Sequence, residues 1–156
     1  MQRVFKSRYH PKGRPPGLVY TQALVKPIGA CMAPLMIGAT VAVLQEERVW
    51  GYLVWGLPSA LLIATLWTHF RLSSIAAEIH IRPGQVAVRS IQDVLLGRPI
   101  DWSPLHNVKA SPDEVELSVG WTTHICRRAD WTNYKTLGDA AQQAIQAQRH
   151  SSSPAP

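Results

Sequence analysis

Two long stretches without a charged residue constrain this chain more than any other feature of its sequence. They run from Ile28 to Leu44 and from Val49 to Trp67. As α-helices they would be about 26 Å and about 28 Å long, close to the ~30 Å thickness of a hydrocarbon core. The alternative is a buried helical hairpin in a globular core, but a chain of 156 residues is too small to surround two such apolar helices. The sequence therefore predicts a transmembrane α-helical hairpin.

The charge distribution predicts the orientation of this hairpin. The formal net charge of +6 is carried by the first 27 residues, whose basic members are Arg3, Lys6, Arg8, Lys12, Arg14 and Lys26. The connection Gln45–Arg48 is short and more acidic than basic. Because basic flanks stay in the cytoplasm, we expect a multi-pass protein of a bacterial-type inner membrane with both termini cytoplasmic. A basic segment beside a membrane also favours anionic lipid over nucleic acid as a partner.

Aromatic residues cluster at the two ends of the second stretch. The residues expected at the membrane interface are Trp50, Tyr52, Trp55 and Trp67. Amphipathic rings favour the headgroup level, so this spacing is typical of a helix that crosses the bilayer.

Small residues lie four apart in the first stretch, where they would allow close helix packing. The predicted packing residues are Gly29, Ala33, Gly38 and Ala42. Their partner is either the second stretch or another protein, and the alternative is that Gly and Ala are simply common in membrane helices. Pro34 and Pro58 are expected to bend the two helices near their middles.

After Ser73 the hydrophobic pattern changes to that of a small soluble domain. Residues 75–81 alternate between apolar and polar, with Glu78 and His80 on the polar face, and further strands are expected at 86–91, 115–119 and 122–127. A helix over 137–149 should follow, beginning with a capping box formed by Thr136 and Asp139. The predicted fold class is thus a membrane α-helical hairpin plus a small α+β domain, with five or six strands in an antiparallel sheet or partial barrel.

These patterns divide the chain into four parts. Residues 1–27 form a basic, Pro-rich cytoplasmic arm that should not fold alone, and residues 28–70 form the hairpin. Residues 72–150 form the cytoplasmic β domain with its C-terminal helix, and residues 151–156 form a polar tail.

A membrane hairpin followed by short strands, the stretch RPIDWSPLHNV, further hairpin strands and a final helix resembles bacterial two-span membrane proteins with a pleckstrin-homology-like cytoplasmic domain. The resemblance covers roughly residues 72–149. It implies a scaffold or assembly role, and it assigns no functional residue.

Few residues suggest chemistry. His124 and Cys126 lie two apart on a predicted strand and share a face, so with His80 or Asp130 they would offer a metal or thiol site. Zinc sites normally show two close ligand pairs and here there is one, which favours ordinary strand residues. Phosphate loops, nucleophile elbows and paired catalytic acids are not found in the sequence. We therefore expect no enzyme activity, no catalytic or metal-binding residues, no cofactor and no small-molecule substrate. Cys31 and Cys126 fall in different parts of the chain, so no disulfide is expected.

The arm and two tryptophans are candidate contact residues. Arg98-x-x-Asp101-Trp102-Ser103 and Arg127-x-x-Asp130-Trp131-Thr132 share a pattern. Each tryptophan either packs onto an Asx or ST turn or anchors a partner or the headgroup layer. The predicted lipid or partner contacts are Arg3, Phe5, Lys6, Arg8, Tyr9, Trp102 and Trp131.

Two functions fit these observations. The first is a non-catalytic accessory, structural or assembly subunit of a multiprotein membrane complex, with an energy-transducing complex, respiratory or photosynthetic, as the kind of host. Its partners would be other membrane protein subunits. The second is a lipid-recognition module that reads anionic headgroups through the basic arm and a pleckstrin-like domain.

Overall fold

The computed structural model describes residues 2–152 and divides the chain into two compact units. One unit is Gly13–Ser74. The other combines the first twelve residues with residues 75–156. The predicted tail at 151–156 begins inside a helix that ends at Ser152, and its last four residues lie outside the described residues.

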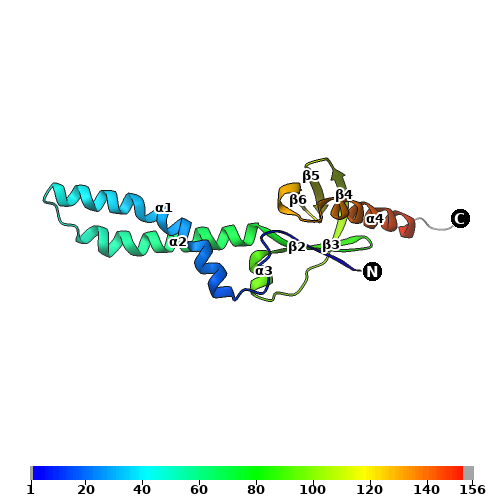
Figure 1. Cartoon of the computed structure of the whole chain (residues 1–156), viewed down its shortest axis with the longest axis horizontal. Helices are drawn as coiled ribbons and strands as arrows, with labels where there is room; N and C mark the ends of the chain where they lie inside the picture. Colours follow the sequence, from blue (N-terminus) through cyan, green and yellow to red (C-terminus); the bar gives the residue numbers. More distant parts are fainter. Residues whose placement is uncertain (1, 153–156) are drawn as a thin grey trace. The chain divides into compact units, whose positions relative to one another are not determined.

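The Gly13–Ser74 unit is a helical hairpin, as predicted (Figure 1). Helix α1 spans Pro16–Leu44, and a π-helical turn over Tyr52–Gly56 leads directly into α2, which spans Leu57–Ser74. Both Pro16–Leu44 and Tyr52–Ser74 are long and apolar enough to cross a membrane. Each observed helix extends beyond the uncharged stretch that predicted it, because the polar flanking residues on the domain side are also helical.

The two predicted helix bends differ in outcome. Pro34 does lie inside α1, as does Pro27. Pro58 lies directly after the π-helical turn, near the start rather than the middle of the continuous helix Tyr52–Ser74, so the predicted mid-helix position is wrong.

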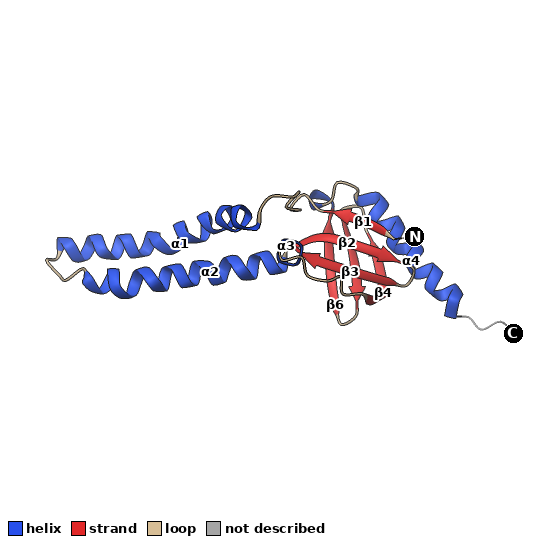
Figure 2. Ribbon diagram, turned by 90° about the horizontal axis from the view of Figure 1, so that it is seen from below, coloured by secondary structure: helices blue, strands red, loops and turns tan. Residues whose placement is uncertain are grey.

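The second unit is a six-stranded antiparallel sheet with the order β1-β2-β3-β4-β5-β6 (Figure 2). Its strands are β1 (Arg3–Lys6), β2 (Ala76–Arg82), β3 (Gln85–Ser90), β4 (Ser103–Ala110), β5 (Glu114–Val119) and β6 (Thr122–Arg127). A short helix α3 (Ile91–Leu95) follows β3, a 3₁₀ turn (Arg128–Asp130) follows β6, and α4 (Tyr134–Ser152) ends the domain. The predicted antiparallel sheet with a C-terminal helix is therefore observed.

Strand β1 comes from the predicted arm. Its Phe5 lies opposite Ile79 of β2. Two residues further on, the backbone N–H of Ser7 donates to Ala77 O at 2.9 Å. The prediction that residues 1–27 form an arm apart from the sheet domain is therefore wrong for Arg3–Lys6. It also fails for Pro16–Pro27, which belong to α1.

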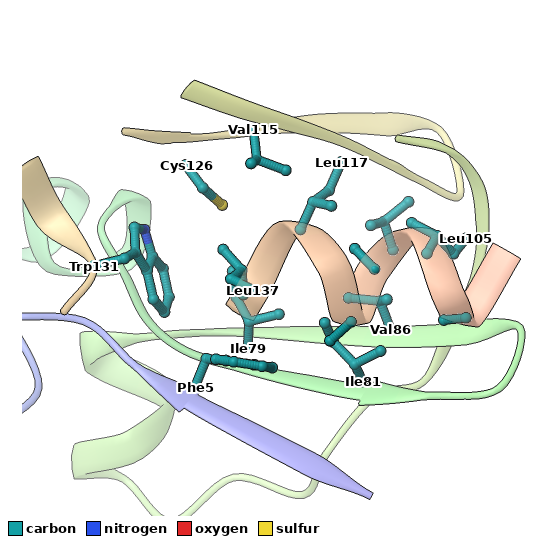
Figure 3. Packing of buried hydrophobic residues seen from close by; sticks show 14 of the residues in the cluster. Phe5, Ile79, Ile81, Val86, Leu105, Val115, Leu117, Cys126, Trp131 and Leu137 are labelled. Atoms are coloured by element: carbon teal, nitrogen blue, oxygen red, sulfur yellow. The ribbon is translucent and has the colours of Figure 1, made fainter. Parts of the chain in front are cut away.

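Helix α4 packs between two halves of the sheet. Strands β3 and β4 share only two residue pairs, so the sheet bends there, and a bridge between Ser7 and Trp131 joins the two ends of the sheet at one corner. Figure 3 shows Leu137 of α4 between Val115, Leu117 and Cys126 on one side and Ile79 on the other. The apolar faces predicted for the strands and the final helix meet in this core.

Local capping explains where the helices begin. Ser90 and Asp93 form a capping box at α3, since Asp93 N–H donates to Ser90 Oγ at 3.1 Å and Ser90 N–H donates to Asp93 Oδ2 at 3.0 Å. The capping box predicted at Thr136 is wrong, because α4 begins at Tyr134 and the Thr136 hydroxyl donates to Asn133 O at 2.8 Å within the first turn.

Candidate functional site

The most elaborate polar arrangement in the described chain is a buried cluster centred on Glu78 of β2. The side-chain carboxylate oxygen Oε1 lies 2.8 Å from His10 Nε2. The other oxygen, Oε2, lies 3.1 Å from His80 Nε2 and 3.2 Å from Arg89 Nη1. The Glu78, His10 and His80 side chains are each less than a tenth exposed. We call Glu78, His10, His80 and Arg89 the Glu78 cluster.

The hydrogen bonds on the far side of each ring assign the histidine tautomers. The backbone N–H of Lys12 donates to His10 Nδ1 at 2.9 Å, so that nitrogen carries a lone pair and the ring proton lies on Nε2. Gln2 accepts from Arg82 through Oε1 at 3.3 Å, which turns its amide nitrogen toward His80 Nδ1 at 3.0 Å. In this arrangement both imidazoles donate Nε2–H to Glu78. The one negative charge of Glu78 is balanced by Arg89.

Arg89 also holds the segment that covers the cluster. Its Nη2 donates to Asp93 O at 3.1 Å and to Arg98 O at 2.8 Å. Beyond this segment, the Arg82 guanidinium lies 3.8 Å from the centroid of the Trp102 ring, whose edge faces His80. These contacts bury Glu78 and His80, which the alternating pattern predicted on the solvent face of a half-buried strand. That prediction is wrong because residues 2–10 and 93–102 cover this face.

The electrostatics of the cluster stabilise the ionised carboxylate. Burial acts to raise the pKa of Glu78, but the hydrogen bonds from His80 and His10 outweigh it and hold that pKa below its ordinary value. Both carboxylate oxygens already accept hydrogen bonds, so Glu78 is ionised and fully engaged at neutral pH. The hydrogen bonds of the Glu78 cluster therefore hold residues 2–10 against strands β2 and β3.

The Glu78 cluster, which we also call the clasp, connects the segment before the helical hairpin to the strand that follows it. Strand β1 precedes the hairpin, β2 follows it directly after Ser74, and Lys6 lies opposite Glu78 in the register of the two strands. A further backbone bond from Arg8 N–H to Asp130 O at 2.9 Å holds the segment after β1. The hairpin is thus an insertion between two neighbouring, hydrogen-bonded strands.

The predicted metal or thiol site is not assembled. His124 and Cys126 share a face of β6, opposite Leu117 and Val115, but that face is the domain core. Burial, with a smaller contribution from the charge of Asp130, raises the pKa of Cys126 to about 12, so its thiol stays protonated at neutral pH. His80 belongs to the Glu78 cluster on a different strand. Within residues 2–152, His, Cys, Asp and Glu form no group of three or more arranged to hold a metal.

The predicted contact residues separate into buried and exposed sets. Phe5 and Trp131 are only 9% and 6% exposed and pack in the core, so the prediction that they contact lipid or a partner is wrong. Trp102 is half-buried under Arg82. Arg8 pairs with Asp130 at 3.2 Å, and its guanidinium lies 4.8 Å from the Tyr9 ring centroid. Arg3 and Lys6 remain exposed on β1.

The small residues of α1 fall on two different faces of the hairpin. A Cβ added at Gly38 would lie 3.0 Å from the Tyr52 ring, and Ala42 is 1% exposed, so this pair faces the interior of the hairpin. Gly29 and Ala33 are exposed, and a Cβ at Gly29 would meet nothing within 4 Å. We call Gly29 and Ala33 the outer small-residue face.

The sequence analysis missed the matching small residues of the second helix. Ala60, Ala64 and Thr68 are buried at four-residue intervals on α2, and Gly56 continues this row toward the connection, where it faces Leu35. This spacing lets two helix backbones approach closely. The same small-residue criterion applied to the second stretch would have found the row. Among the interface aromatics predicted on this segment, Trp50, Trp55 and Trp67 are all more than half exposed. Tyr52 is 36% exposed, and its ring lies against Gly38.

Comparisons of this chain with protein-family models, with curated proteins and with solved structures gave no match. The resemblance to pleckstrin-homology-like membrane proteins stays a prediction.

Proposed function

We propose that this chain is a membrane-anchored, non-catalytic accessory or assembly subunit of a multiprotein membrane complex. The observation that carries the proposal is the apolar surface of the hairpin, whose large side chains are exposed on both helices, such as Ile37 at 66% and Leu62 at 62%. Exposed apolar surface of this extent is unfavourable in water and favourable in lipid or against other membrane helices.

The inserted position of the hairpin supports a same-side topology. Strands β1 and β2 are hydrogen-bonded neighbours, so the segments before and after the hairpin belong to one folded domain. A hairpin that crosses the bilayer twice returns the chain to the side from which it entered. Basic residues near that side, among them Arg14, Lys26 and Arg71, favour the cytoplasm.

Cysteine labelling tests this topology. In a chain lacking Cys31, Glu47→Cys is expected to react with an impermeant maleimide in intact cells, because the helix connection is extracytoplasmic. Lys135→Cys, exposed at the start of α4, should react only after the cells are opened. Cys126 is unsuitable as a probe because it is buried. Labelling of Lys135→Cys in intact cells would overturn the orientation.

A structural role fits the way in which the polar groups of the sheet domain are used. Glu78 is fully engaged in its clasp, Asp93 caps α3, and the Cys126 thiol is protonated in the core. The outer small-residue face offers close contact to a neighbouring membrane helix. Such a chain would act by packing and positioning rather than by transforming a substrate.

Purification in a mild detergent tests the subunit role directly. The tagged full chain is expected to co-purify with other membrane proteins at a fixed stoichiometry that survives a second, orthogonal purification step. Isolation free of other membrane proteins, with normal insertion, would rule out the subunit role while leaving the membrane anchor intact.

Recognition of anionic lipid is a second candidate, favoured by the exposed Arg3 and Lys6 that β1 fixes on the sheet domain. Replacing both with glutamine is expected to weaken retention of anionic lipid, by about 1 kcal/mol or roughly fivefold per charge at low salt. Native mass spectrometry of the purified chain at two salt concentrations measures the retained lipids. Lys109→Gln, an exposed basic residue on β4, is the matched control, and equal losses in both variants would exclude specific headgroup recognition.

A further inference from the structure

Strand β6 leaves one edge of the sheet open. It is the last strand in the sheet order, and β5 is its only strand partner in the described part of the chain. The bridge that joins the sheet ends, between Ser7 and Trp131, lies beyond the end of β6. The edge of Thr122–Arg127 is therefore available for main-chain pairing.

The register identifies the groups on this edge. Strands β5 and β6 are joined by the two-residue turn Gly120-Trp121, with Gly120 at a φ of +55°. Arg128 N–H donates to Asp113 O at 2.8 Å, and hydrogen-bonded pairs alternate along an antiparallel ladder. Counting back from Arg128, every second residue of β6 therefore directs its backbone N–H and C=O toward β5. The residues that direct N–H and C=O outward are Thr123, Ile125 and Arg127.

This edge is less protected than the edge at the other end of the sheet. Strand β1 has four residues, two of which are Arg3 and Lys6, and short charged edge strands resist pairing. Strand β6 has six residues and only one charge, Arg127. Ile125 is 56% exposed beside the open edge, and Trp121 at the adjoining turn is fully exposed.

We propose that β6 pairs with β6 of a second copy of this chain, antiparallel and about a two-fold axis at Ile125. In this register Ile125 lies opposite Ile125 of the second copy, and Thr123 lies opposite Arg127. All three outward residues then pair, giving up to about six main-chain hydrogen bonds and an apolar cross-strand contact at the centre.

The side chains of β6 make this pairing self-complementary. No like charges lie opposite each other, whereas an axis at Arg127 would oppose two guanidinium groups. The exposed Trp121 comes near Arg127 of the second copy, a combination that favours a cation–π contact. Because the contact uses the same surface on both copies, it closes as a dimer rather than extending into a fibre. The dimer goes beyond the proposed function and does not depend on membrane insertion.

The mass of the full chain in mild detergent tests the dimer. Light scattering of the chain expressed without its host complex, corrected for detergent, is expected to give twice the chain mass of 17.3 kDa. Ile125→Lys should halve this mass, because two ammonium groups would then meet at the axis. Thr123→Pro should do the same, since it removes an outward N–H that β5 does not use. Ser118→Lys, on the neighbouring strand but away from the edge, is the control and should stay dimeric.

Disulfide cross-linking tests the register. In a chain lacking Cys31, Ile125→Cys is expected to form a disulfide between copies, while Thr123→Cys alone should not. Combining Thr123→Cys with Arg127→Cys should restore the cross-link. A monomeric wild-type chain, a dimer that persists in Ile125→Lys, or equal cross-linking of Thr123→Cys and Ile125→Cys would each overturn the proposal.

Discussion

Replacing Glu78 with alanine is expected to destabilise the sheet domain by about 3–5 kcal/mol, the usual cost of removing one partner from a buried ion pair. Arg89 would lose the carboxylate that balances its charge, and its Nε is already buried without a hydrogen-bond partner. The rings of His10 and His80 would each lose the acceptor for Nε2–H. Because the side-chain hydrogen bond from His10 to β2 ends on this carboxylate, the segment that contains β1 should detach first.

Hydrogen exchange of the full chain in detergent measures this loss of stability separately for each segment of the backbone. Protection of the backbone amides in Arg3–Lys6 and Ala76–Arg82 should fall in Glu78→Ala. The matched control is Glu116→Ala, which removes an exposed ion pair whose Lys109 nitrogen lies 3.8 Å away and should cost less than about 1 kcal/mol. If both variants exchange alike, the Glu78 cluster does not hold β1 in place.

The pH dependence follows from the direction of the Glu78 pKa shift. A carboxyl whose pKa is lowered on folding contributes stability that is fully present above its unfolded pKa. That contribution is lost as the pH falls through the lowered folded value. The wild-type domain should therefore lose stability on acidification more steeply than Glu78→Gln, which has no carboxyl to protonate at this position.

The hairpin and most of the strands were predictable because their signals are local. An uncharged run reports a helix of membrane length without reference to any other residue. The first predicted stretch lies within α1, and the second overlaps the helix Tyr52–Ser74 over Tyr52–Trp67. The alternation in Glu114–Val119 and Thr122–Arg127 likewise reports a strand whose one face is buried. The C-terminal helix was predicted from a local pattern too: Leu137, Ala141 and Ala144, whose spacing puts them on one helix face, lie in the core.

The Glu78 cluster could not be predicted because its members are brought together only by the fold. His10 and Glu78 are 68 residues apart in the sequence, with the entire hairpin between them. Strand β1 has only four residues, too few for a hydrophobic period, and its one buried side chain is Phe5. In sequence, Glu78 and His80 look like the solvent face of a strand, because alternation gives the faces of a strand but not what covers them.

The faces of α1 were unpredictable for a related reason. Gly29, Ala33, Gly38 and Ala42 share the same four-residue spacing, so the pattern alone assigns both pairs the same role. The position of the π-helical turn separates them, because Tyr52 lies against Gly38, whereas a Cβ at Gly29 would meet no described atom within 4 Å. The four-residue spacing alone therefore does not say which of the two pairs packs against the rest of the hairpin.

Substituting the two pairs separately should therefore give different results. Gly38→Leu is expected to open the hairpin, since even a Cβ would lie 3.0 Å from the Tyr52 ring and a leucine forces α1 and α2 apart. Ala33→Leu should leave the hairpin closed but weaken association with a neighbouring subunit by about 1–3 kcal/mol, the usual cost of overpacking a close contact. Both variants should still insert, because leucine is at least as apolar as the residues it replaces.

A cysteine pair reports the state of the hairpin independently of the partner. Leu35 lies against Gly56, so Leu35→Cys with Gly56→Cys should cross-link in the Ala33→Leu chain and fail to do so in Gly38→Leu. Stoichiometry after mild-detergent purification then reports the partner, with the exposed Ile37→Leu as a volume-conserving control. Loss of the partner from Ala33→Leu with the cross-link intact would identify the outer small-residue face as the contact. If Ala33→Leu instead co-purifies at wild-type stoichiometry, α1 is an anchor only. Contacts with the complex must then lie on the exposed surface of α2 or on the sheet domain.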